Sequence, residues 1–166
     1  MLVADRPRRQ QNLRRLVVLA SAATAESGKL PADVTTADVC AVIPGDAVAN
    51  VVGATLVGAK LIRPDGSHAR CVYTVERPAP GRERVAFVLW LHRPGDFDEL
   101  RTLQENPVKA VEGLGDGAFV SSDGESGRHD LFVLVRGVAA VEVTGPDAEG
   151  VRKVGSAAVE RVRAAR

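Results

Sequence analysis

The sequence predicts an α+β fold, with helices flanking an antiparallel sheet of six strands in the order α-β-β-β-α-β-β-β-α. Two tight turns, Asp65-Gly66 and Arg136-Gly137, each lie between segments with strand character, and tight hairpins join antiparallel neighbours. The third observation is an apolar stripe with helical spacing near the C-terminus, formed by Val151, Val154, Ala158 and Val162. Helices that cover an antiparallel sheet are typical of α+β domains.

Short helices are expected before the first strand. Thr35 and Asp38 form a capping-box-like start for a helical turn, and a second helix is predicted over residues 47–52. The segments 56–63 and 69–76 then flank the first tight turn, so they are predicted to be the two strands of a hairpin.

Residues 85–91 are apolar at every position, which is typical of a central strand covered on both faces. A buried helix is the alternative, because periodicity does not distinguish the two in a continuous apolar run. Trp90 lies in this run and is therefore expected to be a core residue. A helix follows, with a predicted apolar face of Phe97, Leu100 and Leu103. The remaining strands are predicted over residues 117–121, 131–135 and 138–143. Pro146 is expected at the first position of the last helix.

Length and composition predict one domain over residues 35–166, preceded by a linker over residues 26–34. The chain has 166 residues, of which 45% are hydrophobic and 26% charged, so it can bury a sizeable core. The formal net charge of +1 gives no electrostatic footprint for nucleic acid, so no nucleic-acid partner is expected. No stretch approaches the ~18 apolar residues that a spanning helix requires, so no transmembrane helix is expected.

The N-terminal residues have the order of an export signal. Several arginines come first, and an apolar run over residues 16–20 is followed by Ala23-Thr24-Ala25, which has the small-x-small form that signal peptidase accepts. Residues 1–25 are therefore predicted to be an export signal, and the protein is predicted to be extracytoplasmic. The alternative is a basic and apolar N-terminal segment that stays attached as a surface helix.

Cys40 and Cys71 are the two cysteines of the chain. Two cysteines this far apart do not match a typical zinc site, whereas in an oxidising compartment they are compatible with one disulfide bond. Two buried, unconnected thiols are the alternative, because free cysteines often behave as small core residues. The disulfide prediction depends on export.

Residue types used in catalysis occur without the spacing that catalysis or metal binding requires. His68, His92 and His129 lie in separate turns or strand ends and form no metal-binding pair. Ser126, His129 and Asp130 supply the residue types of a catalytic triad within one short segment. Triad members converge from separate elements, so a polar hairpin loop explains this segment better.

The glycine-rich segment 113–117 has the composition of a phosphate-binding loop. A strand follows it where such a loop requires a helix, so a tight turn is predicted instead. Asp96, Asp98 and Glu99 are attributed to helix capping and to the helix dipole. No catalytic residue, cofactor or metal site is therefore predicted.

Three segments resemble a family of small actinobacterial secreted lipoproteins whose function is not established. Residues 40–53 resemble the family's opening, with a first cysteine and a helix that ends in glycine. Residues 71–73 (CVY) are similar to its second cysteine followed by an aromatic residue. The most specific match, residues 113–119 (GLGDGAF), resembles its Gly-Leu-Gly-Asp-x-Ala-aromatic stretch. The likeness covers about residues 35–163, and the lipobox cysteine is missing.

The resemblance implies an extracytoplasmic, disulfide-bonded domain with the sandwich fold of Mog1 and PsbP-like proteins, and it carries no catalytic residues across. The first interpretation is a non-enzymatic binding or accessory domain of the cell envelope, whose partner is an envelope component, a small ligand or another protein. One alternative is a small hydrolase or cyclase with a pocket between sheet and helix, where acidic or histidine side chains would have to converge. The other is a cytosolic interaction protein with reduced cysteines.

Overall fold

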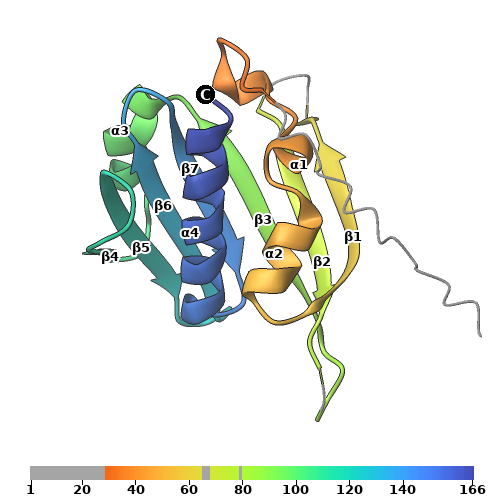
Figure 1. The fold of residues 1–166 in the computed structure, drawn as a ribbon. Helices are drawn as coiled ribbons and strands as arrows, with labels where there is room; N and C mark the ends of the chain where they lie inside the picture. The colour runs from red at the N-terminus through yellow and green to blue at the C-terminus, as the bar shows by residue number, and fades with distance from the viewer. Residues whose placement is uncertain (1–28, 65–67, 79) are drawn as a thin grey trace, which may run out of the picture.

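The computed structural model describes residues 29–64, 68–78 and 80–166. These residues form one antiparallel sheet of seven strands in the order β1-β2-β3-β7-β6-β5-β4, with helices packed on it (Figure 1). The α+β class predicted from the sequence is therefore confirmed. The predicted export signal over residues 1–25 and the turn residues Asp65 and Gly66 lie outside the described residues.

The elements are short, and most are joined by brief loops. The strands are β1 (Thr55–Ile62), β2 (Arg70–Glu76), β3 (Arg84–His92), β4 (Val108–Ala110), β5 (Gly117–Asp123), β6 (Arg128–Val135) and β7 (Ala139–Gly145). The α-helices are α1 (Val39–Val42), α2 (Gly45–Val51), α3 (Phe97–Thr102) and α4 (Ala148–Ala164). Two 3-10 turns, η1 (Val34–Thr36) and η3 (Pro94–Asp96), precede α1 and α3.

The predicted element order is wrong in two places. The sheet has seven strands rather than six, because β4 pairs with β5 at the sheet edge and places Val108 opposite Ser121. β4 has only three residues, too few to show an alternating pattern in the sequence. The predicted order also counts one helix before β1, whereas the expected helical turn and second helix are two separate helices, α1 and α2, because Ile43 and Pro44 between them have extended backbone.

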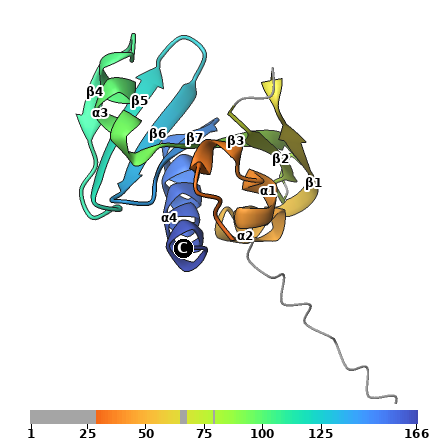
Figure 2. The same ribbon diagram turned by 90° about the horizontal axis from the view of Figure 1, so that it is seen from above.

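Two antiparallel meanders build the sheet, one from β1 to β3 and the other from β4 to β7. They join where β3 pairs with β7, which places Trp90 opposite Glu142. Both views show β3 and β7 side by side in the middle of the sheet (Figures 1 and 2). Residues far apart along the chain therefore meet at the centre of the molecule.

Helices α1, α2 and α4 cover one face of the sheet (Figure 1). The predicted stripe of α4 is buried, as expected. The helix lies so close to β6 that a Cβ atom on Gly155 would be 2.5 Å from Cδ2 of Leu131. The carboxylate of Asp147 accepts a hydrogen bond from the N–H of Gly150 at 2.6 Å and caps the helix. Because Asp147 is the cap, Pro146 precedes the helix and does not occupy its first position.

The chain is tied to the domain before its first helical turn. The N–H of Leu30 donates a hydrogen bond to the carbonyl oxygen of Ala165 at 3.0 Å, and the Leu30 side chain packs against the core. Part of the segment predicted to be a linker thus contacts the end of α4.

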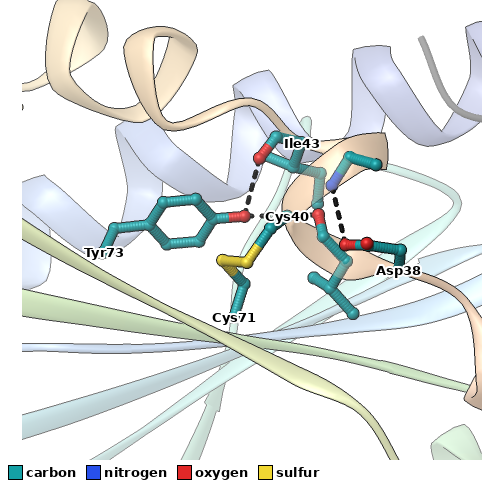
Figure 3. Close-up of a disulfide and its surroundings, with 7 residues drawn as sticks. Asp38, Cys40, Ile43, Cys71 and Tyr73 are labelled. Carbon is teal, nitrogen blue, oxygen red and sulfur yellow. Dashed lines mark hydrogen bonds between the residues drawn. A yellow bond between two sulfur atoms is a disulfide. The ribbon is translucent and has the colours of Figure 1, made fainter. Parts of the chain in front are cut away.

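A disulfide bond joins Cys40 of α1 to Cys71 of β2, with the two Cα atoms 5.2 Å apart (Figure 3). Beside it, the hydroxyl group of the buried Tyr73 donates a hydrogen bond to the carbonyl oxygen of Ile43 at 2.7 Å. Burial raises the pKa of the Tyr73 phenol, so the hydroxyl group stays protonated and can act as a donor. The disulfide and this hydrogen bond together hold α1 against the sheet.

The opposite side of the sheet is less covered, and we call it the open face. It carries Arg70 of β2, Trp90 and His92 of β3, and Glu142 of β7. Burial along β3 alternates between buried residues under the helices and more exposed residues on the open face. The prediction that residues 85–91 are covered on both faces is therefore wrong. Trp90 is half-buried rather than a core residue, because α1, α2 and α4 all pack on the other side.

Helix α3 lies on the open face, where it packs near β5 and β6. The ring of Phe97 contacts that of Phe119, which stacks on Phe132 with ring centroids 4.6 Å apart. Leu103, predicted to belong to the apolar face of this helix, caps its C-terminal end and is 66% exposed. Among the described α-helices, none covers the part of the open face formed by β2 and β3.

Candidate ligand-binding face

Three neighbouring strands bring one row of side chains together on the open face. In the register of β2, β3 and β7, Arg70 lies opposite Trp90, and Trp90 lies opposite Glu142. Directly opposite residues of antiparallel strands are close enough for their side chains to interact. The row therefore places a cation, an indole ring and a carboxylate side by side, on strands from both meanders.

The guanidinium group of Arg70 lies over the indole ring of Trp90. Its Cζ atom is 5.5 Å from the ring centroid, within the range of a cation–π interaction. The Nε atom of Arg70 is buried and has no hydrogen-bond partner in the described part of the chain. A buried donor without a partner is unfavourable, and a guanidinium group with unused donors can bind a carboxylate or phosphate group.

The carboxylate of Glu142 pairs with His92 instead of Arg70. Nε2 of His92 and Oε2 of Glu142 are 2.7 Å apart, and the two side chains are 13% and 14% exposed. The ring of His68, at the end of the first hairpin, lies 5.5 Å from the His92 ring. None of the ion pairs among the described residues includes Arg70, so its charge has no acidic partner there.

A second polar group lies on β6 and β7. The hydroxyl group of Thr144 donates a hydrogen bond to Oδ1 of Asp130 at 2.5 Å, and Nε of Arg128 donates to the same oxygen at 2.9 Å. These side chains are hydrogen-bonded to one another, whereas Nε of Arg70 has no hydrogen-bond partner among the described residues. The surroundings of Arg70 and Trp90 are therefore the better candidate for binding another molecule.

The three triad-type residues are not brought together. Oγ of Ser126 donates a hydrogen bond to Asp123 at 2.6 Å, and this bond lowers the pKa of Asp123. Nδ1 of His129 lies 2.8 Å from Oγ of Ser122, and Asp130 has the separate partners described above. The three residues hold the β5–β6 hairpin together, which agrees with the interpretation of a polar loop.

The histidines and acidic residues form no metal centre in the described ranges. His68 and His92 lie near each other, whereas His129 lies on β6 with a different partner. No group of three or more His, Cys, Asp or Glu side chains that could hold a metal ion is found among the described residues. Asp98 and Glu99 lie in the first turn of α3, where negative charge suits the helix dipole.

The glycine-rich segment is a turn that leads into β5, as predicted. Gly115 has a φ of +61°, and a Cβ atom there would lie 2.5 Å from the carbonyl oxygen of Leu134. The same carbonyl accepts a hydrogen bond from the N–H of Asp116 at 2.8 Å. The Asp116 carboxylate accepts another from the N–H of Arg136 at 2.8 Å. The segment therefore holds the start of β5 against the end of β6.

A cavity of about 130 Å³ lies between the sheet and α4, where the enzyme alternative expects a pocket. It is lined by Val111, Val120, Leu131, Ala148, Val151 and Arg152. This lining contains no Asp, Glu or His, so the acidic and histidine side chains that a hydrolase or cyclase would need do not converge in this cavity.

A larger groove, of about 520 Å³, is lined in part by Asp33 and Arg93. Oδ2 of Asp33 accepts a hydrogen bond from the Arg93 guanidinium group at 2.8 Å, and Oδ1 accepts one from the Thr35 hydroxyl group. The hydrogen bond from Arg93, followed by those from Thr35, lowers the pKa of Asp33 to about 2.

This ion pair predicts a specific sensitivity to acid. The pKa of Asp33 is about 2 in the folded protein and 3.8 without partners. Between these two pH values the unfolded chain binds more protons than the folded protein. The free energy of unfolding therefore falls as the pH falls through this interval. Arg93→Gln should make this fall smaller when urea unfolding is measured between about pH 2 and pH 6. Arg152→Gln is the control, because its guanidinium group reaches a backbone carbonyl rather than a carboxylate. Identical pH dependence in both variants would contradict the assignment.

Comparison of the chain with protein-family models, curated proteins and solved structures finds no match. The resemblance to secreted lipoproteins therefore remains an expectation drawn from the sequence. The disulfide bond fits an oxidising location outside the cytoplasm. In the described ranges, no helix combines the length and the apolar character needed to cross a bilayer.

The open face was not predicted from the sequence, although the alternation of residues in one of its strands indicates it. Residues 70–76 (RCVYTVE) alternate, so Arg70 could have been placed on the side of β2 opposite Cys71 and Tyr73. The continuous apolar run over residues 85–91 hides the same alternation in β3. The neighbourhood of Trp90 and Glu142 depends on the pairing of β3 with β7, which no local pattern indicates.

Proposed function

We propose that the protein is a non-enzymatic binding or accessory domain of the cell envelope, outside the cytoplasm, and that its ligand or partner contacts the open face around Arg70 and Trp90. The observation that carries the proposal is an unpaired guanidinium group over a half-buried indole ring, on a part of the sheet that no described α-helix covers. A sheet normally buries its apolar side chains against another layer. A second molecule would supply that layer here.

The Cys40–Cys71 bond supports a location outside the cytoplasm, because disulfide bonds persist in oxidising compartments and are rare where thiols are kept reduced. The order of basic, apolar and small residues over 1–25 points to the same location. The resemblance to secreted lipoproteins agrees with both.

The proposal is tested first on protein recovered from its native host without reductant. The intact mass should correspond to loss of residues 1–25 and should be two hydrogens lower than that of the reduced chain, because Cys40 and Cys71 are bonded. A full-length, fully reduced mass would contradict export and favour the cytosolic alternative.

The same protein then serves to test binding. Trp90 is the single tryptophan of the chain, so its fluorescence reports on the open face alone. Fractions of the native host's cell envelope, extracted into water and into detergent, should shift the Trp90 emission in a saturable manner. An emission spectrum that no fraction changes would contradict binding at this face.

A further inference from the structure

Arg70 lies over the Trp90 ring but has no acidic partner among the described residues. Its Nε atom is buried without a hydrogen-bond partner in the described part of the chain. The nearest carboxylate in its row, Glu142, lies beyond Trp90 and is hydrogen-bonded to His92. The Arg77 and Arg93 guanidinium groups, by contrast, each pair with an aspartate. Arg70 is therefore a cation without an acidic partner among the described residues, and an anion from outside could supply one.

The surface beside Arg70 is apolar. Val72 and Val88 lie opposite each other in the next pair of residues on the open face, and Trp90 lies on the same side of β3 as Val88. All three are only partly buried. A ligand whose anionic group reaches Arg70 would thus rest its remaining atoms on an aromatic and aliphatic floor, which favours an apolar or aromatic body.

The charges around the site favour a singly charged anion. Arg70 is the one cation in the row itself, Lys60 lies one strand farther out, opposite Val72, and Glu142 contributes negative charge two strands from Arg70. A carboxylate matches the two parallel donors of a guanidinium group and carries one negative charge. A phosphate monoester carries close to two and would meet more repulsion from Glu142.

We infer that the open face around Arg70 and Trp90 binds a small organic carboxylate whose body is apolar or aromatic. The carboxylate pairs with the Arg70 guanidinium group, and the body packs on Trp90, Val72 and Val88. This inference rests on the proposed function, because it names the class of ligand that the open face takes.

Three probes with the same body and different head groups test the inference: 4-phenylbutyrate, 4-phenylbutylamine and 4-phenylbutanol. Each is titrated into the protein while Trp90 emission is recorded, and calorimetry on the same samples gives the affinity independently. The carboxylate should bind about tenfold or more tightly than the amine or the alcohol, as expected for a charge-assisted contact that the other head groups cannot make. 4-Phenylbutyl phosphate, added as a fourth probe with the same body, should bind more weakly than the carboxylate.

Two substitutions provide the matched comparison, one inside the site and one far from it. Arg70→Gln removes the guanidinium group and should weaken 4-phenylbutyrate binding about tenfold or more. Lys109→Gln removes an exposed cation from β4, at the far edge of the sheet, and should leave the affinity unchanged within about twofold. Circular dichroism and a melting curve establish that both variants are folded.

The possible results separate this inference from the proposed function. Equal affinity for all head groups, or undiminished carboxylate binding in Arg70→Gln, would overturn the inference and leave the open face as an apolar binding surface. No response to any probe, when an envelope fraction does shift Trp90 emission, would overturn the inference and leave the proposed function in place. A response to neither probes nor fractions would overturn both.

Discussion

Replacing Cys40 with serine should lower the free energy of unfolding by about 3.5 kcal/mol and the melting temperature by about 10 °C. The Cys40–Cys71 bond joins residues 31 positions apart, and its loss gives the unfolded chain more conformational freedom. It also releases α1, which has four residues and is too short to be stable without tertiary contacts. Urea unfolding of the oxidised protein and of the variant measures the difference.

A reducing agent provides the control for this experiment. Reduced wild-type protein should unfold at the urea concentration of the variant, and the variant itself should not respond to the reducing agent. Position 40 is chosen because Cys40 is half-buried, whereas Cys71 is fully buried and a serine hydroxyl group there would add its own desolvation cost. Equal stability of the oxidised and reduced wild-type protein would show that the bond has no structural role.

Replacing Gly115 with alanine should destabilise the protein by about 3 kcal/mol or more. The added Cβ atom would lie 2.5 Å from both the carbonyl oxygen of Leu134 and Cγ1 of Val133, and a backbone carbonyl in a paired strand cannot move aside. The positive φ of +61° is also unfavourable for alanine. The loop that leads into β5 would have to move away from β6, and the start of β5 would lose its position.

Gly113 gives a matched control two residues earlier in the same loop. Its φ is +72°, yet a Cβ atom there would meet nothing within 4 Å. Gly113→Ala should therefore lower the free energy of unfolding by only about 1 kcal/mol, which is the cost of placing alanine in a backbone conformation with positive φ. Urea unfolding of both variants distinguishes the effect of the close approach to Leu134 from the effect of the positive φ. An equal loss of stability in the two variants would show that the contact with Leu134 has no effect.

Features that depend on neighbouring residues could be predicted from the sequence. The β6–β7 hairpin at Arg136-Gly137 and the buried stripe of α4 are confirmed, because turn chemistry and helical periodicity act over a few positions. The pairing of Cys40 with Cys71 could be predicted because no other cysteine competes. The short strand β4 could not, since its three residues owe their conformation to β5.

Which side of β3 forms the open face depends on long-range packing. Val88 and Trp90 are as apolar as the buried residues of β3, so the sequence favours a strand here but does not indicate which side of it is covered. The covered side is the one on which α1, α2 and α4 pack. The register between β3 and β7 then brings Glu142 beside Trp90 across about 50 positions of the chain. Which face of the sheet the helices cover, and how β3 is aligned with β7, depend on the whole assembled sheet. Both are set by the packing of many residues that are distant in the sequence.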